Sequence, residues 1–275
     1  MEISFHPSLA GIPAIEWPES GRVASGAGFA AIDLDLEALA PYPAADVRTT
    51  LRALGLRANA CPLPVEMRED DRAFAVGFER FERLAAYAAE IGIRTMHRSI
   101  PASTNRLPAD YTPLLRRRWS ALAAIARAYG IVLAVEPLGP LYRRRAGRHE
   151  LIWRLDDAAE FAASCGAGVG LLVDSWHWHL AGLTARDVVD VGALIVHVHI
   201  ADVPAGVSAE AQRDTERALP GEGVVDLAAF LGAVSAAGYR LPVSPEVPGR
   251  WSEGMTPAAA ARRALAATTG ALEPV

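Results

Sequence analysis

Two short apolar runs in the second half of this chain decide its fold: VGLLVD at 169–174 and IVHVHI at 195–200. Each run has the length of a buried strand, and the residues between them leave room for a helix. The first run ends on Asp174, and the second carries His199 next to its end. A buried strand, a helix and a second buried strand are typical of a parallel βαβ unit, so this segment predicts an α/β fold.

Comparable runs recur along the whole chain, with longer helical patterns between them. The predicted strands cover residues 3–8, 29–36, 56–62, 93–100, 131–137, 169–174, 195–200 and 242–247. Eight strand–helix units in 275 residues favour closure into a (β/α)8 TIM barrel over an open sheet. We therefore expect one barrel domain over residues 1–275. Its first helix should be short or irregular, because residues 8–29 are rich in Pro, Gly and Ser.

Capping residues predict where two of the helices begin and end. Thr112-Pro113 reads as a cap followed by proline at the first helical position, and Gly130 marks the end of that helix. Thr256-Pro257 predicts a second start of the same kind, and Gly270 the corresponding end.

Four predicted strands end on, or next to, residues that bind hard or borderline metal ions: Glu136, Asp174, His199 and Glu246. Side chains alternate along a strand, so His197 shares the face of His199 and the aliphatic residues of that run take the other face. A hydrophobic core gives no reason to repeat such residues at strand ends, whereas an enzyme that builds a metal site at the rim of a barrel does. The pattern predicts an enzyme.

Composition argues against several other classes of protein. Lys and Arg total 27 against 32 Asp and Glu, a net charge of −5, which does not favour a nucleic-acid or anionic membrane surface. Cys61 and Cys165 lie far apart and suggest no disulfide framework. The first residues lack the pattern of an export signal, and no apolar run is long enough to span a membrane. We expect a cytoplasmic protein.

The segments around the four strand ends resemble xylose isomerase-like TIM barrels. This superfamily includes sugar-phosphate isomerases and epimerases, ketose 3-epimerases and endonucleases that act at abasic DNA sites. The matching segments are VEPL at 135–138, VDSWH at 173–177, HVHIAD at 197–202, PGEG at 220–223 and SPEV at 244–247. They occur in the same order as in the family. The first hundred residues share with the family only the alternation of strands and helices.

The resemblance implies that Glu136, Asp174, His199 and Glu246 together coordinate one divalent metal ion. Mixed carboxylate and imidazole ligands suit Mn²⁺, Mg²⁺, Co²⁺ or Zn²⁺, and the residue types do not choose among them.

The resemblance also implies three substrate-binding residues. His177 looks like the family's histidine that contacts the substrate or polarises its oxygen. Arg217 is similar to the family arginine that precedes the PGEG loop, and it would orient a hydroxyl or a phosphate. Trp176, beside His177 in sequence, is expected next to the substrate.

This ligand set predicts an isomerase or epimerase of a sugar, a sugar phosphate or a related polyhydroxy carbonyl compound. A divalent ion that chelates a carbonyl oxygen and the neighbouring hydroxyl acidifies the carbon-bound hydrogen and stabilises the enediolate. Glu136 and Glu246 would remove and return the proton, one on each face, so the expected catalytic residues are Glu136, Glu246 and His177.

Three other functions stay open. A dehydratase acting on a keto-inositol or a related keto-acid shares the first step, after which a β-hydroxyl leaves. An abasic-site endonuclease would need more histidines and a basic groove, which an acidic chain with 7 histidines does not favour. A barrel that binds a ligand or a metal without turnover is the third. For the isomerase, the epimerase and the dehydratase, the expected binding partner is a small polyhydroxy substrate, and no nucleic acid or membrane is expected to bind. The sequence leaves a homo-oligomer open.

The rest of the chain offers further residues that could line the substrate pocket: His6, Asp33, Cys61, His97 and Arg98. The segment 201–217 follows a strand that carries a predicted ligand. In a barrel this makes it a candidate loop over the active site.

Overall fold

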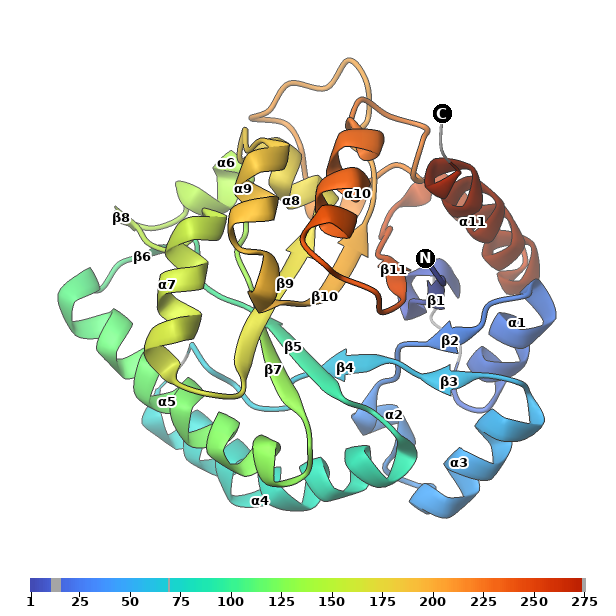
Figure 1. Cartoon of the computed structure of the whole chain (residues 1–275), viewed down its shortest axis with the longest axis horizontal. Helices are drawn as coiled ribbons and strands as arrows, with labels where there is room; N and C mark the ends of the chain where they lie inside the picture. The colour runs from blue at the N-terminus through green and yellow to red at the C-terminus, as the bar shows by residue number, and fades with distance from the viewer. Residues whose placement is uncertain (11–15, 69, 274–275) are drawn as a thin grey trace.

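The strands form a closed barrel of parallel neighbours, surrounded by helices (Figure 1). The computed structural model describes residues 1–10, 16–68 and 70–273. The barrel strands are β1 (Ser4–Phe5), β2 (Ala31–Ile32), β3 (Arg57–Ala58), β4 (Ala60–Pro62), β5 (Thr95–Ser99), β7 (Val132–Glu136), β9 (Val169–Asp174), β10 (Ile195–Ile200) and β11 (Val243–Pro245). A short antiparallel pair, β6 (Ser103–Thr104) and β8 (His149–Glu150), lies outside the barrel order.

Two sheets together form the closed barrel. One has the order β11-β10-β9-β7-β5-β4 and the other the order β1-β2-β3, and the neighbours within each are parallel. Ile3 forms a bridge with Val243 of β11, and the amide of Leu34 donates to the carbonyl of Ala60 in β4. These two contacts join the sheets, and the predicted TIM barrel is confirmed.

The connecting segments are mostly helical. The α-helices are α1 (Glu19–Ala27), α2 (Leu36–Leu39), α3 (Ala44–Ala53), α4 (Asp71–Ile91), α5 (Pro108–Ala128), α6 (Leu141–Arg144), α7 (Leu155–Cys165), α8 (Ser175–Leu180), α9 (Ala185–Asp190), α10 (Leu227–Ala236) and α11 (Pro257–Leu272). Short 3-10 turns are η1 (Pro7–Ala10), η2 (Gly192–Leu194), η3 (Asp214–Glu216) and η4 (Arg250–Ser252). No helix in the described part of the chain is both long and apolar enough to cross a membrane.

Each of the eight predicted strands contains strand structure, and the third is divided. Its first part, β3, pairs with β2, and its second part, β4, pairs with β5. Asn59 lies between the two parts, where its amide nitrogen Nδ2 donates to Asp33 and to Ser244.

The first helix is short, as the sequence predicts. α1 has 9 residues, whereas α4 and α5 have 21 each. Residues 11–15 of the predicted irregular region lie outside the described residues.

Two predicted helix boundaries are wrong. α5 begins at Pro108 rather than Pro113, because Pro108 itself occupies the first helical position and the helix tolerates Pro113 in its second turn. α11 begins at Pro257 as predicted but runs through Gly270 to Leu272. A glycine ends a helix when it adopts a positive φ, as Gly130 does at 68°, and Gly270 does not.

Candidate metal centre

The four predicted ligands come together at the carboxyl ends of adjacent strands. Glu136 is the last residue of β7, Asp174 is the last residue of β9, and Glu246 follows β11 directly. His199 lies on β10, in register with Asp174 on one side and Ser244 on the other. One ligand atom from each of the four lies within 4.8 Å of the others, so parallel pairing has brought residues more than a hundred positions apart into one group.

The ring of His199 stands at the centre of this group. Its Nδ1 lies 3.3 Å from Oε2 of Glu246, 3.9 Å from Oε1 of Glu136 and 4.0 Å from Oδ2 of Asp174. Oε1 of Glu136 and both ring nitrogens of His199 are buried without a hydrogen-bond partner. Buried polar atoms are rarely left without a partner. Three carboxylates and an imidazole that converge in this way fit a divalent cation.

Arg217 places a positive charge against two of the carboxylates. Its Nη1 lies 2.8 Å from Oδ2 of Asp174 and 2.9 Å from Oε2 of Glu246, and its side chain is only 3% exposed. Burial alone would lower the pKa of Arg217, but Asp174 and Glu246 outweigh burial and raise it, so the guanidinium stays charged.

Burial and neighbouring charges shift the pKa values of the individual ligands in different directions. Burial, and then the charge of Glu246, raise the pKa of Glu136. Burial also acts to raise the pKa of Glu246, but Arg217 and His199 outweigh it and hold that pKa well below the usual range. For His199, burial acts to lower the pKa, and Glu246, Glu136 and Asp174 raise it to about 9. The cluster attracts positive charge, whether a proton, a guanidinium or a metal ion.

Asp174 connects this centre to the start of α8. Its Oδ1 accepts hydrogen bonds from the backbone amides of Trp176 and His177, while its Oδ2 faces Arg217. His177 is thereby held with Nε2 3.9 Å from Oε1 of Glu136. The predicted substrate residue His177 therefore lies beside the ligand group.

Trp176 is fully buried, and it lies under Arg217, whose guanidinium carbon is 4.8 Å from the centre of the indole ring. This contact supports a role in holding Arg217, and direct contact between Trp176 and a substrate stays a prediction. Neighbouring Trp178 is a packing residue: its Nε1 donates to the carbonyl of Thr184, and its ring lies 5.3 Å from that of Phe230.

The sequence did not single out Asp214, which reaches the same site. It belongs to the segment 201–217 that the sequence predicts over the active site, and its Oδ1 lies 3.1 Å from Nη2 of Arg217 and 3.8 Å from Nε2 of His177. Its Oδ2 accepts from the hydroxyl of Tyr142 and from Arg143. Burial acts to raise the pKa of Asp214, but His177 and Arg217 outweigh it and lower that pKa to about 2. In the sequence, Asp214 could have been recognised as a site residue from its position three residues before Arg217.

Two of the five residues suggested as pocket lining show no contact with the four ligands among the described residues. The Cys61 thiol is fully buried, and burial raises its pKa. Arg98 donates to the carbonyl of Leu63 and pairs with Glu66.

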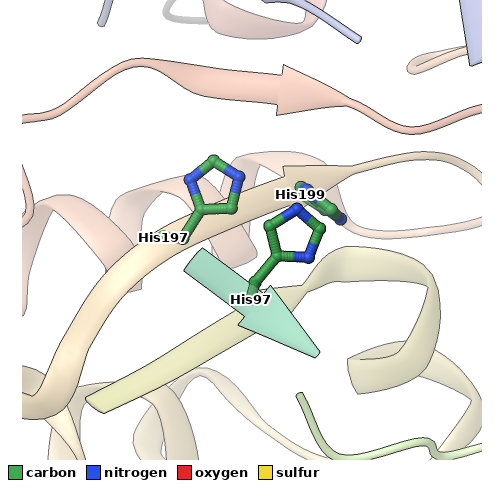
Figure 2. A group of neighbouring side chains, drawn as sticks. All are labelled: His97, His197 and His199. Carbon is green, nitrogen blue, oxygen red and sulfur yellow. The ribbon is translucent and has the colours of Figure 1, made fainter. Parts of the chain in front are cut away.

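The other three lie close to His199. The Nε2 atom of His6 lies 3.8 Å from Oε1 of Glu246. Asp33 and His97 are buried: Asp33 directly follows β2, and His97 lies on β5 two residues before the end of that strand. Figure 2 shows His97, from β5, pointing toward His197 and His199, from β10.

Comparison with known proteins points to the same fold. The chain is 30% identical over 238 residues to a 3-dehydroshikimate dehydratase of Pseudomonas aeruginosa; the match covers 84% of this chain and 36% of that protein's length. Among solved structures, a xylose isomerase domain protein from Alicyclobacillus acidocaldarius has a TM-score of 0.90 at 26% identity, with 99% of this chain and 98% of that chain covered. The IolI protein, solved with a bound zinc atom, has a TM-score of 0.85 at 19% identity over 99% of this chain and 98% of that chain.

A family profile described as xylose isomerase-like TIM barrel matches residues 22–269. Together with the closed barrel and the ligand group at its carboxyl end, this match establishes that the chain belongs to the xylose isomerase-like TIM barrel family.

Proposed function

We propose that this protein is a divalent-metal-dependent isomerase or epimerase of a sugar, a sugar phosphate or a related polyhydroxy carbonyl compound. The observation that carries the proposal is the convergence of Glu136, Asp174, His199 and Glu246 at the carboxyl end of the barrel. In TIM barrels the active site lies at this end.

The same four residues would hold the ion. Three carboxylates and one imidazole suit Mn²⁺, Mg²⁺, Co²⁺ or Zn²⁺. The chemistry that such an ion supplies is polarisation of a substrate carbonyl, which acidifies the neighbouring C–H bond.

Glu136 and Glu246 are the proposed proton carriers. In the sheet, β9 and β10 separate the strands that deliver them, so the two carboxyl groups lie at opposite ends of the ligand group. A substrate carbon placed between them would present one face to each glutamate. When one glutamate removes the proton and the other returns a proton to the opposite face of the same carbon, that carbon is inverted. When the proton returns to the former carbonyl carbon and the hydroxyl proton passes to the former carbonyl oxygen, the carbonyl moves to the neighbouring carbon.

His177 and Arg217 are the proposed substrate-positioning residues. His177 lies beside Glu136 on one side and Asp214 on the other. Nη2 of Arg217 is 3.4 Å from Nε2 of His177, so the two side chains can bind neighbouring oxygens of one substrate. A guanidinium fixed by buried carboxylates would orient a hydroxyl or phosphate oxygen without rearrangement.

A dehydratase is the second candidate, and one observation favours it. The curated relative at 30% identity is a 3-dehydroshikimate dehydratase. Proton removal beside the carbonyl is common to both reactions, and a dehydratase goes on to expel the β-hydroxyl as water. This chain spans about a third of that relative's length.

The deciding experiment uses metal-free protein reloaded separately with Mn²⁺, Mg²⁺, Co²⁺ or Zn²⁺, with a panel of ketoses, keto-inositols and 3-dehydroshikimate in D2O. We expect metal-dependent deuterium incorporation beside the carbonyl, followed by NMR, together with a rearranged or inverted product. Formation of an unsaturated product, followed by ultraviolet absorbance, would instead establish the dehydratase.

Variants Glu136→Gln and Glu246→Gln should each abolish formation of the inverted or rearranged product, because each removes one of the two proposed proton carriers. Glu222→Gln is the matched control, since Glu222 pairs with Arg263 on an exposed surface. Metal-dependent nicking of abasic DNA, or metal binding without exchange on any member of the panel, would overturn the proposal.

A further inference from the structure

Below the metal centre, the barrel interior contains a group of imidazoles. We call His97, His197 and His199 the lower histidine cluster (Figure 2). His197 lies two residues before His199 on β10, and His97 is in register with Ala134, two residues before Glu136 on β7. The cluster therefore reaches one layer deeper into the barrel than the carboxylates.

The three rings are close together and buried. Their centres are 4.8 to 5.4 Å apart, and one ring nitrogen from each residue lies within 4.8 Å of the other two. The relative exposures are 8% for His97, 1% for His197 and 1% for His199. Aliphatic side chains normally fill this part of a TIM barrel, so three imidazoles here call for a specific partner.

The nitrogens that these rings present have no partner. Nε2 of His97, Nε2 of His197 and both ring nitrogens of His199 are buried without a hydrogen bond. An unpaired buried polar group costs about 1–3 kcal/mol. A ligand that satisfies several of these nitrogens at once would recover that free energy.

A carboxylate lies next to the cluster. Oδ1 of Asp33 accepts hydrogen bonds from Ser4, Asn59 and the backbone amide of Ala60. Its Oδ2 is buried without a partner, 3.9 Å from Nε2 of His197. The local donor set is therefore three imidazoles and a fixed carboxylate.

We propose that the lower histidine cluster is a second metal site, which takes Zn²⁺ or a similar borderline ion and has Asp33 as its neighbouring carboxylate. Imidazole ligands favour such ions, whereas the carboxylates above favour Mn²⁺ and Mg²⁺ as well. Zinc binds imidazole nitrogens at about 2.0–2.1 Å in tetrahedral sites, so the rings must close toward one another on binding. This site goes beyond the proposed function and does not depend on turnover.

The two donor sets share His199. Its Nδ1 faces the three carboxylates, which leaves its Nε2 for the lower cluster. If both sites were filled, Nδ1 of this ring would be available to one ion and Nε2 to the other, and the neutral imidazole would give up its N–H proton to solvent.

The test is a calorimetric titration of metal-free protein with Zn²⁺ alone and, separately, with Mn²⁺ alone. We expect the wild type to bind two equivalents of Zn²⁺ and one of Mn²⁺. His97→Gln should reduce the Zn²⁺ stoichiometry to one and leave that of Mn²⁺ unchanged. The matched control is His149→Gln, because His149 lies on β8 outside the barrel; it should keep two equivalents of Zn²⁺.

A single zinc equivalent in the wild type, or two in folded His97→Gln, would overturn the second site. If His97→Gln does not fold, anomalous diffraction from zinc-soaked wild-type crystals decides, since a peak among the three rings supports the site and its absence refutes it. Glu136→Gln separates this inference from the proposed function: it should weaken Mn²⁺ binding and leave zinc at the lower cluster.

Discussion

The two halves of the barrel differ in strand regularity and in the chemistry they carry. In the second half, β7, β9 and β10 have five or six residues each, and the metal ligands stand at or beside strand ends. In the first half, β1, β2 and β3 have two residues each, whereas β5, which carries the buried His97, has five.

This difference indicates a division of roles. Long parallel strands hold their neighbours in fixed register, so they can place ligand atoms from different strands together. Short strands followed by irregular segments leave room for variation around the substrate. We infer that the second half carries the reaction and that the first half supports the ligands from below and shapes the pocket.

The largest expected effect comes from the second half. Glu246→Gln removes a proposed proton carrier, so turnover in metal-saturated protein should fall about 10²–10⁴-fold. Steady-state kinetics on the substrate found by the panel measures it, with Glu222→Gln as the control. Turnover within a few-fold of the wild type would mean that Glu246 does not move the proton.

Arg217→Ala should have the next largest effect, on stability. It leaves Asp174 and Glu246 without the guanidinium that pairs with them, and breaking a buried ion pair costs about 3–5 kcal/mol. Chemical denaturation without metal measures the loss, and saturating Mn²⁺ should restore part of it by supplying positive charge. Arg186→Ala is the control, since its pair with Asp190 is exposed and should contribute little to stability. If Mn²⁺ did not reduce the loss of stability in Arg217→Ala, the metal ion and Arg217 would not be neutralising the same carboxylates.

Asp33→Asn tests the supporting role of the first half. Its Oδ1 accepts three hydrogen bonds in the barrel interior, and disturbing them should cost about 1–3 kcal/mol of unfolding free energy. The affinity for Mn²⁺, measured by calorimetry, should stay close to that of the wild type. If Asp33→Asn lost as much Mn²⁺ binding as Glu136→Gln, the first half of the barrel would also take part in metal binding, and the two halves would not differ in role.

Asp214→Asn should have an effect of about 1–3 kcal/mol on the free energy of unfolding, because the neutral side chain keeps hydrogen bonds from Tyr142 and Arg143 but loses its charge against Arg217. The pKa of Asp214 is lowered to about 2. Its charged form therefore stabilises the fold above the unfolded pKa of about 3.9. That contribution is lost as the pH falls toward 2.

Denaturation of the wild type and of Asp214→Asn at a series of pH values checks this prediction. The stability difference between them should narrow as the pH falls from about 4 to about 2. Asp190→Asn, at an exposed position, should show no such narrowing. A difference that is constant over this range would show that the charge of Asp214 does not contribute.

Much of the site was predictable because it depends on local patterns. A strand period of two residues puts His197 and His199 on one face, and parallel strands bring their carboxyl ends to one rim. Those two rules predict the grouping of Glu136, Asp174 and His199, which the structure contains. Local cap signals were less reliable, since Thr112-Pro113 looks like a helix start and lies inside α5.

Contacts across the barrel were not predictable in this way. His97 meets His197 although β7 and β9 separate their strands in the sheet. Asp214 reaches His177 from a long connecting segment with no periodic pattern. Neither contact follows from the spacing of residues along the chain.

The sequence by itself determined the order of strands and helices, the barrel class and the residue types at the rim, because hydrophobic periodicity and strand parity are local properties. Tertiary structure alone decided that Arg217 lies between Asp174 and Glu246, that Asp214 holds Arg217, and that three imidazoles share the interior. These contacts arise when the sheet closes on itself and a loop folds over its end, and closure joins residues whose separation in sequence carries no information about their distance.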